Sequence, residues 1–549
     1  MNYNYLRPGI GNAASYQAAG IPWYTSSLAP ALSTTSVVVN LPQVTKFVTI
    51  KNTSTTGDNL RFTFNNDSVV DNTNYVLLES GESFSADFRV TDIHLISDTE
   101  TPVPFTIVNG LTNIRRQEMT STTPVPPNLL AWAQKQKILA DDPDGSPEGD
   151  RFGVSLSATG GALAISSYRD EQNGGSDAGA VYIFQNSSAG YQQVQKLTAS
   201  GDVDPAQDTF GRALAFNSTG DILGIGARGD EENGLFAGSV YVFQSSSVGY
   251  QQVQKLTASG EASTVEDIFG SSLTFSSTGN ILAIGAFGDE ENGGPYAGAV
   301  YIFQSSSVGY QQVQKLTASG DADPAYDYFG SADAISISST GDILAIGAYA
   351  DEENGLSAGS VYIFQSSSVG YQQVQKLTAS GDADPAIDLF GATLSLSSAG
   401  NILAVGAFGD EENGGTNAGS VYIFQSGSTG FQQVQKLTAS GDINPAGDYF
   451  SVGLSLSPSA NKLAVGSWAD EENGGTNAGS VYVFQSSSVG YQQVQKLTAS
   501  GDADPAGDRF GRSVSFNSAE DTVVIGAWRD DEGGIDAGAA YIFKYTRDY

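Results

Sequence analysis

The sequence contains no cysteine and a single histidine, His94. Without cysteine no disulfide can brace the fold, so stability must come from buried sheet surface. A Ser-His-Asp or Cys-His catalytic arrangement cannot be built away from His94, and zinc sites of the usual His/Cys kind are excluded. His94 itself falls in a predicted strand, residues 93–96, where a surface or packed structural role is the simpler interpretation.

The chain also lacks long apolar runs and has little positive charge. No stretch approaches 18 consecutive apolar residues, so we expect no membrane insertion. The N-terminus has no basic segment followed by an apolar core, so we expect no secretory signal. Asp and Glu number 60 against 25 Lys and Arg, a net charge of −35. This balance argues against nucleic acid or an anionic membrane as the ligand.

What the sequence has in abundance is repetition. A unit typified by residues 390–424 recurs seven times, at intervals of 58 to 61 residues. Each unit contains four short strand-like runs separated by clusters of Gly, Ser and Asn. Seven four-stranded units predict a seven-bladed β-propeller, in which radial repetition leaves only short exposed edges. The units open at Phe152, Phe210, Phe269, Phe329, Phe390, Phe450 and Phe510.

The two ends of the repeated region complement each other. The seventh unit stops after residues 540–543 and lacks a fourth strand, whereas residues 132–140 match the fourth-strand segment 191–199 of the first unit. We therefore predict a ring in which this N-terminal strand completes the last blade. The alternative, an open stack of repeats, would leave two unpaired edges.

Two dipeptides recur around the first and second strands, as in Phe269-Gly270 and Gly285-Ala286. With them, residues 132–549 resemble FG-GAP repeats of the integrin α-chain propeller type. There are departures: the expected Pro after Gly-Ala is replaced, and the first unit has Ser166-Ser167 in place of that dipeptide. Many FG-GAP repeats carry an Asp-rich calcium loop between the first two strands. Here that loop is a short turn such as 277–280, which implies that the family's calcium site is absent there.

Acidic residues concentrate in the loop after the second strand and in the connection between units. Both should open on one face of a propeller, which would place 44 of the 60 acids there. Two interpretations of these acids stay open: they form solvated loops that keep the protein soluble, or they bind a cation. We expect no required cofactor, and Ca²⁺ is the candidate cation. The candidate metal ligands are Asp289, Glu290, Asn292, Asp321, Asp323 and Asp327.

The units differ most at two loop positions on this acidic face. After the Gly-Ala dipeptide or its substitute stand Tyr168, Arg228, Phe287, Tyr349, Phe408, Trp468 and Trp528. Just before the opening Phe stand Arg151, Thr209, Ile268, Tyr328, Leu389, Tyr449 and Arg509. Aromatic rings beside carboxylates suit sugar recognition, so the first set is our candidate ligand-binding site. The alternative is that these side chains wedge between blades.

The region before the repeats predicts a second β domain. Residues 1–33 have no periodicity and suggest an extended arm. Residues 34–119 contain seven short strand-like runs, which predict a β-sandwich or jelly roll that serves as an anchor. Residues 120–131 are rich in Pro and suggest a stiff linker.

Short motifs in this first domain, at 15–22, 77–83 and 110–114, resemble small virion surface (decoration or fibre) proteins of tailed phages and marine viruses. The resemblance implies that residues 1–119 dock on a capsid or tail protein and that the propeller is displayed for contact with a host-surface glycan or protein. We therefore expect a non-enzymatic virion protein, assembled in the host cytoplasm and able to form a homo-oligomer. The alternatives are an extracellular bacterial adhesin or matrix protein, and a polysaccharide-acting enzyme.

Overall fold

The computed structural model describes residues 22–29, 37–40, 43–63, 76–86, 92–98, 103–115, 130–139 and 149–547, apart from loop residues 160, 172–174, 202–203, 260–265, 291–292, 321–322, 381–384, 412–414, 441–443, 472–474 and 501–503. Regular structure within these residues is all β-strand, as predicted. The chain divides into two compact units between Leu130 and Ala131. In the part that the structure describes, no helix is long and apolar enough to cross a membrane.

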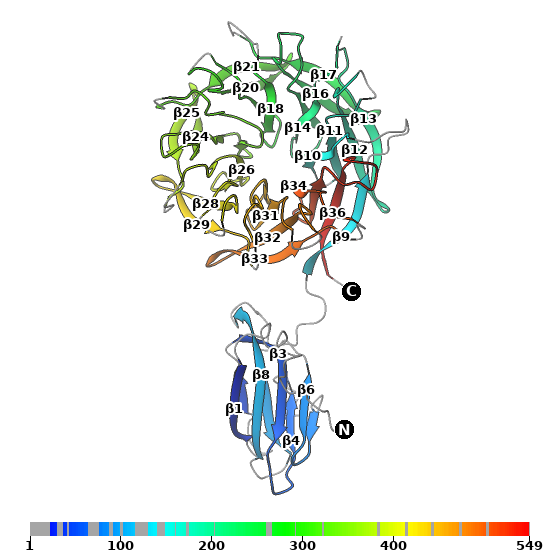
Figure 1. Ribbon diagram of the computed structural model, residues 1–549, viewed down its shortest axis with the longest axis vertical. Coiled ribbons are helices and arrows are strands. Elements are labelled where there is room, and N and C mark those ends of the chain that lie inside the picture. Colours follow the sequence, from blue (N-terminus) through cyan, green and yellow to red (C-terminus); the bar gives the residue numbers. More distant parts are fainter. Residues whose placement is uncertain are drawn as a thin grey trace. The chain divides into compact units, whose positions relative to one another are not determined.

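The first unit is a sandwich of two four-stranded antiparallel sheets (Figure 1), with strand orders β1-β8-β3-β6 and β2-β7-β4-β5. First therefore pairs with last, second with seventh, third with sixth and fourth with fifth, which is the order of a jelly roll. The structure confirms the predicted sandwich and decides between its two forms. The strands are β1 (Pro22–Ala29), β2 (Val37–Asn40), β3 (Gln43–Asn52), β4 (Leu60–Thr63), β5 (Val76–Leu78), β6 (Ser83–Ala86), β7 (Asp92–Ser97) and β8 (Val103–Arg115).

The predicted arm, residues 1–33, has to be shortened. Its residues 22–29 form β1, which pairs with β8 from Pro22 opposite Gly110 to Ala29 opposite Val103. This eighth strand completes the jelly roll, so the domain begins before residue 34. Its sequence, PWYTSSLA, does not alternate clearly between apolar and polar residues, which is why the pattern suggested an irregular segment. The rest of the predicted arm, and residues 120–129 of the predicted linker, lie outside the described residues.

Apolar side chains from both sheets form the core of the jelly roll. His94 lies in β7 between Val38 of β2 and Thr63 of β4, and it is only 4% exposed, which fits a packed structural residue. The core comprises Ile50, Leu60, Phe62, Leu78, Ile93, Leu95, Val103, Phe105 and Ile107.

The second unit is a seven-bladed propeller, as predicted (Figure 1). From the channel outward, the strands of blades 1 to 3 are β10 (Phe152–Ala158), β11 (Ala162–Ser167), β12 (Ala180–Ser187) and β13 (Gly190–Leu197); β14 (Phe210–Phe216), β15 (Ile222–Ala227), β16 (Ser239–Ser246) and β17 (Gly249–Leu256); and β18 (Phe269–Phe275), β19 (Ile281–Ala286), β20 (Ala299–Ser306) and β21 (Gly309–Leu316). Those of blades 4 to 6 are β22 (Ile335–Ile337), β23 (Ile343–Ala348), β24 (Ser360–Ser367) and β25 (Gly370–Leu377); β26 (Thr393–Leu396), β27 (Ile402–Ala407), β28 (Ser420–Gly427) and β29 (Gly430–Leu437); and β30 (Gly453–Leu456), β31 (Lys462–Ser467), β32 (Ser480–Ser487) and β33 (Gly490–Leu497). Blade 7 consists of β34 (Phe510–Phe516), β35 (Thr522–Ala527), β36 (Ala539–Arg547) and β9 (Leu130–Leu139).

Burial within a blade follows the predicted order. In blade 3, the second strand, β19, is buried at five of its six residues, whereas the outer strand, β21, is mostly exposed or half-buried. The opening Phe269 packs edge-to-face on Tyr301 and Phe303 of the third strand, with ring centroids 5.5 and 6.0 Å apart. Such tilted contacts are favourable for aromatic rings and hold the first strand over the third. Equivalent contacts recur in every blade.

The ring closes where the sequence predicted. β9 lies beside β36 in the seventh sheet (Figure 1), so an N-terminal strand completes the last blade. The side-chain amide of Gln495 in blade 6 accepts the Trp132 N–H at 2.9 Å and donates to the Trp132 carbonyl at 2.8 Å. The same two-bond clamp joins outer strands elsewhere, as between Gln254 and Tyr310. The Gln-rich fourth strands therefore join neighbouring blades through side chains, in addition to the ladders within each sheet.

Candidate ligand-binding site at the channel mouth

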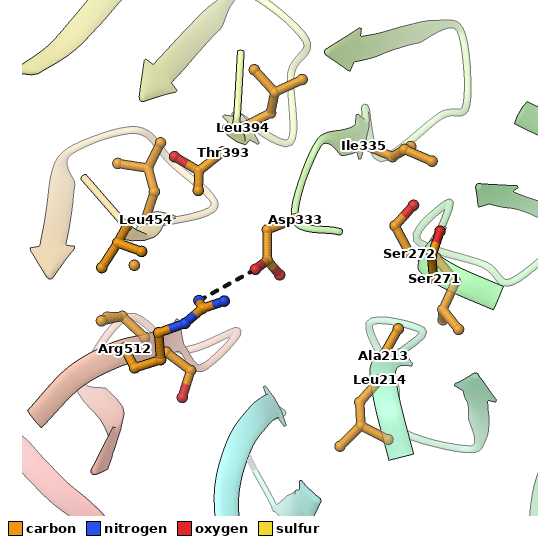
Figure 2. A pocket seen from close by; sticks show the side chains of 15 residues that line it. Ala213, Leu214, Ser271, Ser272, Asp333, Ile335, Thr393, Leu394, Leu454 and Arg512 are labelled. Carbon is orange, nitrogen blue, oxygen red and sulfur yellow. Dashed lines mark ion pairs between the residues drawn. The ribbon is translucent and has the colours of Figure 1, made fainter. Parts of the chain in front are cut away.

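The first strands of the blades line a central channel. A cavity of about 160 Å³ within it is lined by side chains from blades 2 to 7. Figure 2 shows Asp333 of blade 4 and Arg512 of blade 7 pointing toward one another across this cavity, with Asp333 Oδ2 and Arg512 Nη1 3.6 Å apart. The Asp333 side chain is 57% exposed, and the separation exceeds hydrogen-bond length. The pair is therefore a loose contact between blades that are not neighbours.

Asp333 owes its position to an insertion. Blade 4 has two more residues between Phe329 and Gly341 than blade 5 has between Phe390 and Gly400. Asp333 lies within the longer segment and adopts a positive φ of 63°. The insertion breaks the sevenfold symmetry of the channel and sets one carboxylate into it.

The predicted ligand-binding residues meet at one end of the channel. We call the two seven-residue sets that flank the blades there, from Tyr168 to Trp528 and from Arg151 to Arg509, the mouth ring. Along parts of this ring, side chains of the two sets alternate in contact. Ring centroids are 5.9 Å apart for Phe287 and Tyr328, 5.2 Å for Tyr328 and Tyr349, 6.3 Å for Phe408 and Tyr449, and 5.0 Å for Tyr449 and Trp468.

The alternation continues with guanidinium groups in place of rings. Arg509 lies over Trp468 at 4.3 Å and over Trp528 at 5.0 Å, measured to the ring centroids. Arg151 lies over Trp528 at 4.5 Å and donates to the Tyr168 hydroxyl at 2.7 Å. These side chains wedge between blades, as the alternative interpretation predicted. All seven candidate ligand-binding residues nevertheless remain half-buried, so each keeps an accessible surface.

The turn before each opening Phe is in an unusual conformation. All seven residues there have φ between 54° and 60°, including the β-branched Thr209 and Ile268, for which this region is costly. Two hydrogen bonds to the preceding blade hold the turn: the Ile268 N–H donates to Phe236 O and the Phe269 N–H to Ala237 O, both at 3.0 Å. The mouth ring is therefore fixed by the contacts between blades rather than by local preference.

Arginines gather on one side of the mouth. Blades 7, 1 and 2 contribute all eight arginines of the propeller. Seven of them, all but Arg547, we call the arginine arc: Arg151, Arg169, Arg212, Arg228, Arg509, Arg512 and Arg529. Burial, followed by the charges of Arg228 and Arg512, lowers the pKa of Arg212 to about 10. Burial and then the neighbouring Arg529 and Arg151 lower the pKa of Arg509. The arc is thus a region of mutually repelling positive charge.

Carboxylates near the arc compensate it only weakly. The Arg169 Nε lies 3.6 Å from Asp177, and the Arg529 Nε lies 3.6 Å from Asp536. Both Nε atoms, and that of Arg151, are buried without a hydrogen-bond acceptor in the described part of the chain. Repulsion without close compensation favours an added anion.

A second cavity, of about 240 Å³, opens at the mouth, and we call it the mouth cavity. Its lining joins two guanidinium groups, from Arg228 and Arg512, to the rings of Phe287, Tyr349 and Phe408. Four of the seven predicted ligand-binding residues thus line one cavity. Tyr168, Trp468 and Trp528 lie in the mouth ring, in the contacts with arginines and with Tyr449 described above.

Those of the predicted metal ligands that the structure describes do not form a metal-binding group. Asp289 is 1% exposed, and its Oδ2 accepts hydrogen bonds from the Tyr301 hydroxyl at 2.6 Å and from Lys315 Nζ at 2.7 Å. Asp327 is equally buried, whereas Glu290 and Asp323 are exposed. Asn292 and Asp321 lie outside the described residues. No group of three His, Cys, Asp or Glu side chains in the described residues is arranged to hold a metal ion.

The predicted solvated acidic face is also only partly correct. The first acid of each inner loop accepts a lysine Nζ at 2.6–2.8 Å and a tyrosine hydroxyl at 2.6–3.0 Å within its own blade. The last acid of each connection is buried as well, and all fourteen are at most 3% exposed. They are Asp170, Asp230, Asp289, Asp351, Asp410, Asp470 and Asp530, and Asp150, Asp208, Asp267, Asp327, Asp388, Asp448 and Asp508.

The FG-GAP repeat model matches seven segments of the chain: 132–184, 191–243, 250–303, 310–364, 371–424, 431–484 and 491–543. The chain belongs to the FG-GAP repeat family. Each FG-GAP segment starts with the fourth strand of one blade and ends with the third strand of the next, so the first segment includes the closing strand β9. The glycines of the FG-GAP motif have a steric reason: a Cβ on Gly226 would lie 2.1 Å from the carbonyl oxygen of Gly270 in the next blade.

A comparison of this FG-GAP protein with curated proteins found no match. Among solved structures, the periplasmic gluconolactonase PpgL of Pseudomonas aeruginosa is similar at 14% identity and a TM-score of 0.41, over 63% of this chain and 85% of that one. A functionally unknown protein from Desulfotomaculum acetoxidans DSM 771 is similar at 11% identity and a TM-score of 0.41, over 64% and 86% of the two chains.

Proposed function

We propose that this FG-GAP protein is a non-enzymatic attachment module of a virion surface. In this proposal the jelly roll docks on a capsid or tail protein, and the mouth ring of the propeller contacts a host-surface glycan or protein. The observation that carries it is the mouth ring, because aromatic faces and polar groups converge there on a cavity of about 240 Å³.

The buried carboxylates support a binding role over an enzymatic one. Catalysis by paired carboxylates uses two groups in unlike environments. The seven inner-loop carboxylates instead share one environment, a lysine and a tyrosine of the same blade, as with Asp289, Lys315 and Tyr301. Such repetition suits a stable scaffold for display.

The jelly-roll order supports the anchoring role by analogy, because this architecture is common in viral capsid and lectin domains. The test is to fractionate native particles and cells on a density gradient and to detect the chain in each fraction. Sedimentation with particles would support the virion assignment. Recovery on virus-free cells would favour an adhesin instead.

The contact role has its own test. The full chain with Trp468→Ala and Trp528→Ala should bind host cells or an immobilised glycan panel at least tenfold more weakly than wild type. The matched control is Val308→Ser with Val369→Ser, because both valines are 77% exposed in turns at the opposite ends of the blades. Unchanged binding by the tryptophan variant would contradict a contact through the mouth ring.

A further inference from the structure

Charge is distributed unevenly within the propeller. The fourth strand of each blade carries a lysine that is already paired with a buried aspartate at 2.6–2.8 Å. In the described part of the chain, the ion pairs of the arginine arc are looser: those to Asp177, Asp333 and Asp536 are all 3.6 Å long. In a chain of net charge −35, seven arginines with loose partners in three adjacent blades therefore call for an explanation.

The remaining blades supply a different surface at the same mouth. Phe287, Tyr328, Tyr349, Phe408 and Tyr449 of blades 3 to 6 contribute rings, with Tyr328 and Tyr349 stacked at an interplanar angle of 6°. The mouth cavity joins the two surfaces, because Arg228 and Arg512 line it together with Phe287, Tyr349 and Phe408. The carboxylate of Asp333 lines the cavity as well, so a ligand would meet guanidinium groups and ring faces and would have to displace Asp333.

Asp333 shows what the arc can accept. The insertion of blade 4 carries its carboxylate across the channel toward Arg512, yet the two groups remain 3.6 Å apart and Asp333 is 57% exposed (Figure 2). A guanidinium group forms two parallel hydrogen bonds with a well-placed carboxylate, which this distance does not allow. A carboxylate from a ligand can therefore displace Asp333 and bind more closely.

We propose that the mouth cavity binds a terminal acidic sugar, with its carboxylate against Arg228 and Arg512 and its ring against the aromatic side chains of blades 3 to 5. This inference rests on the proposed function and adds the charge and class of the ligand. A single terminal acid fits better than a polyanionic chain, because exposed acids such as Glu290 and Asp323 surround the mouth and repel extended polyanions.

The test is equilibrium binding of the full chain to three probes at low and high salt: sialyllactose, lactose and polygalacturonate. We expect sialyllactose to bind at least tenfold more tightly than lactose and polygalacturonate, with an affinity that falls as salt rises. Arg228→Gln and Arg512→Gln should each lose at least tenfold for sialyllactose. Lys135→Gln, which removes the same charge from an exposed outer-strand position, should bind as wild type does.

A further variant tests displacement of Asp333. Asp333→Asn removes the internal competitor and should strengthen binding of sialyllactose severalfold while leaving lactose unchanged. Equal binding of sialyllactose and lactose would overturn the inference but leave the proposed attachment function standing. Inorganic sulfate that competes as well as sialyllactose would show a simple anion site and overturn the sugar assignment. Failure of the tryptophan variants to lose cell binding would instead count against the proposed function.

Discussion

The buried Asp–Lys–Tyr cluster of each blade allows a quantitative test of what holds the propeller together. In blade 3, Lys315→Met would remove the cationic partner of the Asp289 carboxylate, which is 1% exposed and also accepts the Tyr301 hydroxyl. Breaking a buried ion pair by removing one partner typically costs 3–5 kcal/mol, and we expect about 3 kcal/mol here because the Lys315 side chain is 18% exposed. At about 2 cal/mol/K of unfolding entropy per residue, a propeller of this length should melt roughly 3 to 4 °C lower.

A double-mutant cycle on the full chain measures the coupling. Combining Lys315→Met with Asp289→Asn should recover most of the lost free energy of unfolding, because the buried amide carries no charge that needs a cationic partner. Lys135→Met, at an exposed outer-strand position, serves as the control and should change the free energy of unfolding by less than about 0.5 kcal/mol. A cost below about 1 kcal/mol for Lys315→Met, or strict additivity in the cycle, would refute the reasoning.

Three further predictions concern the tyrosines and the acidic loops. The Tyr310 hydroxyl donates a hydrogen bond to the Gly279 carbonyl in a turn of the same blade, whereas blade 5 has Phe431 at the equivalent position. Phe431→Tyr should therefore raise the free energy of unfolding, measured by urea titration, by about 1 kcal/mol. No gain would show that the turn of blade 5 differs. Burial raises the pKa of Tyr310, and of three equivalent tyrosines, from 10 to about 12. The stabilisation that these tyrosines contribute should therefore be complete below pH 10 and be lost as the pH rises through about 12. Tyrosinate absorbance followed together with circular dichroism would detect the loss. Calcium binding by the acidic loops stays a proposal. Because Lys315 Nζ already forms an ion pair with Asp289, we expect EDTA to leave the melting temperature unchanged. A clear drop in the melting temperature would place calcium among the remaining loop acids.

The propeller could be predicted from the sequence because its signals are local and repeated. Strand alternation, turn residues and the Phe-Gly dipeptide occur seven times, so an error in one unit is corrected by the others. The closing strand was predictable for the same reason, since residues 132–140 match a segment present in every complete unit. In the jelly roll there is no repetition, and β1, whose residues PWYTSSLA do not alternate, was taken for part of an arm.

The candidate site was only partly predictable. The mouth ring followed from loop positions that vary while the strands do not. The arginine arc could have been found by noting that the arginines of the propeller are confined to three units. That these arginines lie close to one another, however, depends on closure of the ring, which makes the seventh and first units neighbours. The burial of Asp289 could not be predicted from the sequence, because its partners Tyr301 and Lys315 lie in the third and fourth strands and reach it only when the blade folds. Asp289 and the six equivalent inner-loop aspartates are therefore paired with lysines inside their blades, whereas acids such as Glu290 remain exposed.

Closure by β9 has a consequence for how the molecule is made. The strand that ends at Leu139 leaves the ribosome about 400 residues before β36 begins at Ala539. At a synthesis rate of roughly 5–20 residues per second, the apolar side chain of Trp132, which packs against residues of blades 6 and 7, waits about 20 to 80 s for the last of its neighbours. Blades 1 to 6 can stack as they emerge, but the circle is sealed only after translation. The first strand of the propeller to be synthesised is therefore the last to gain its sheet partner, β36.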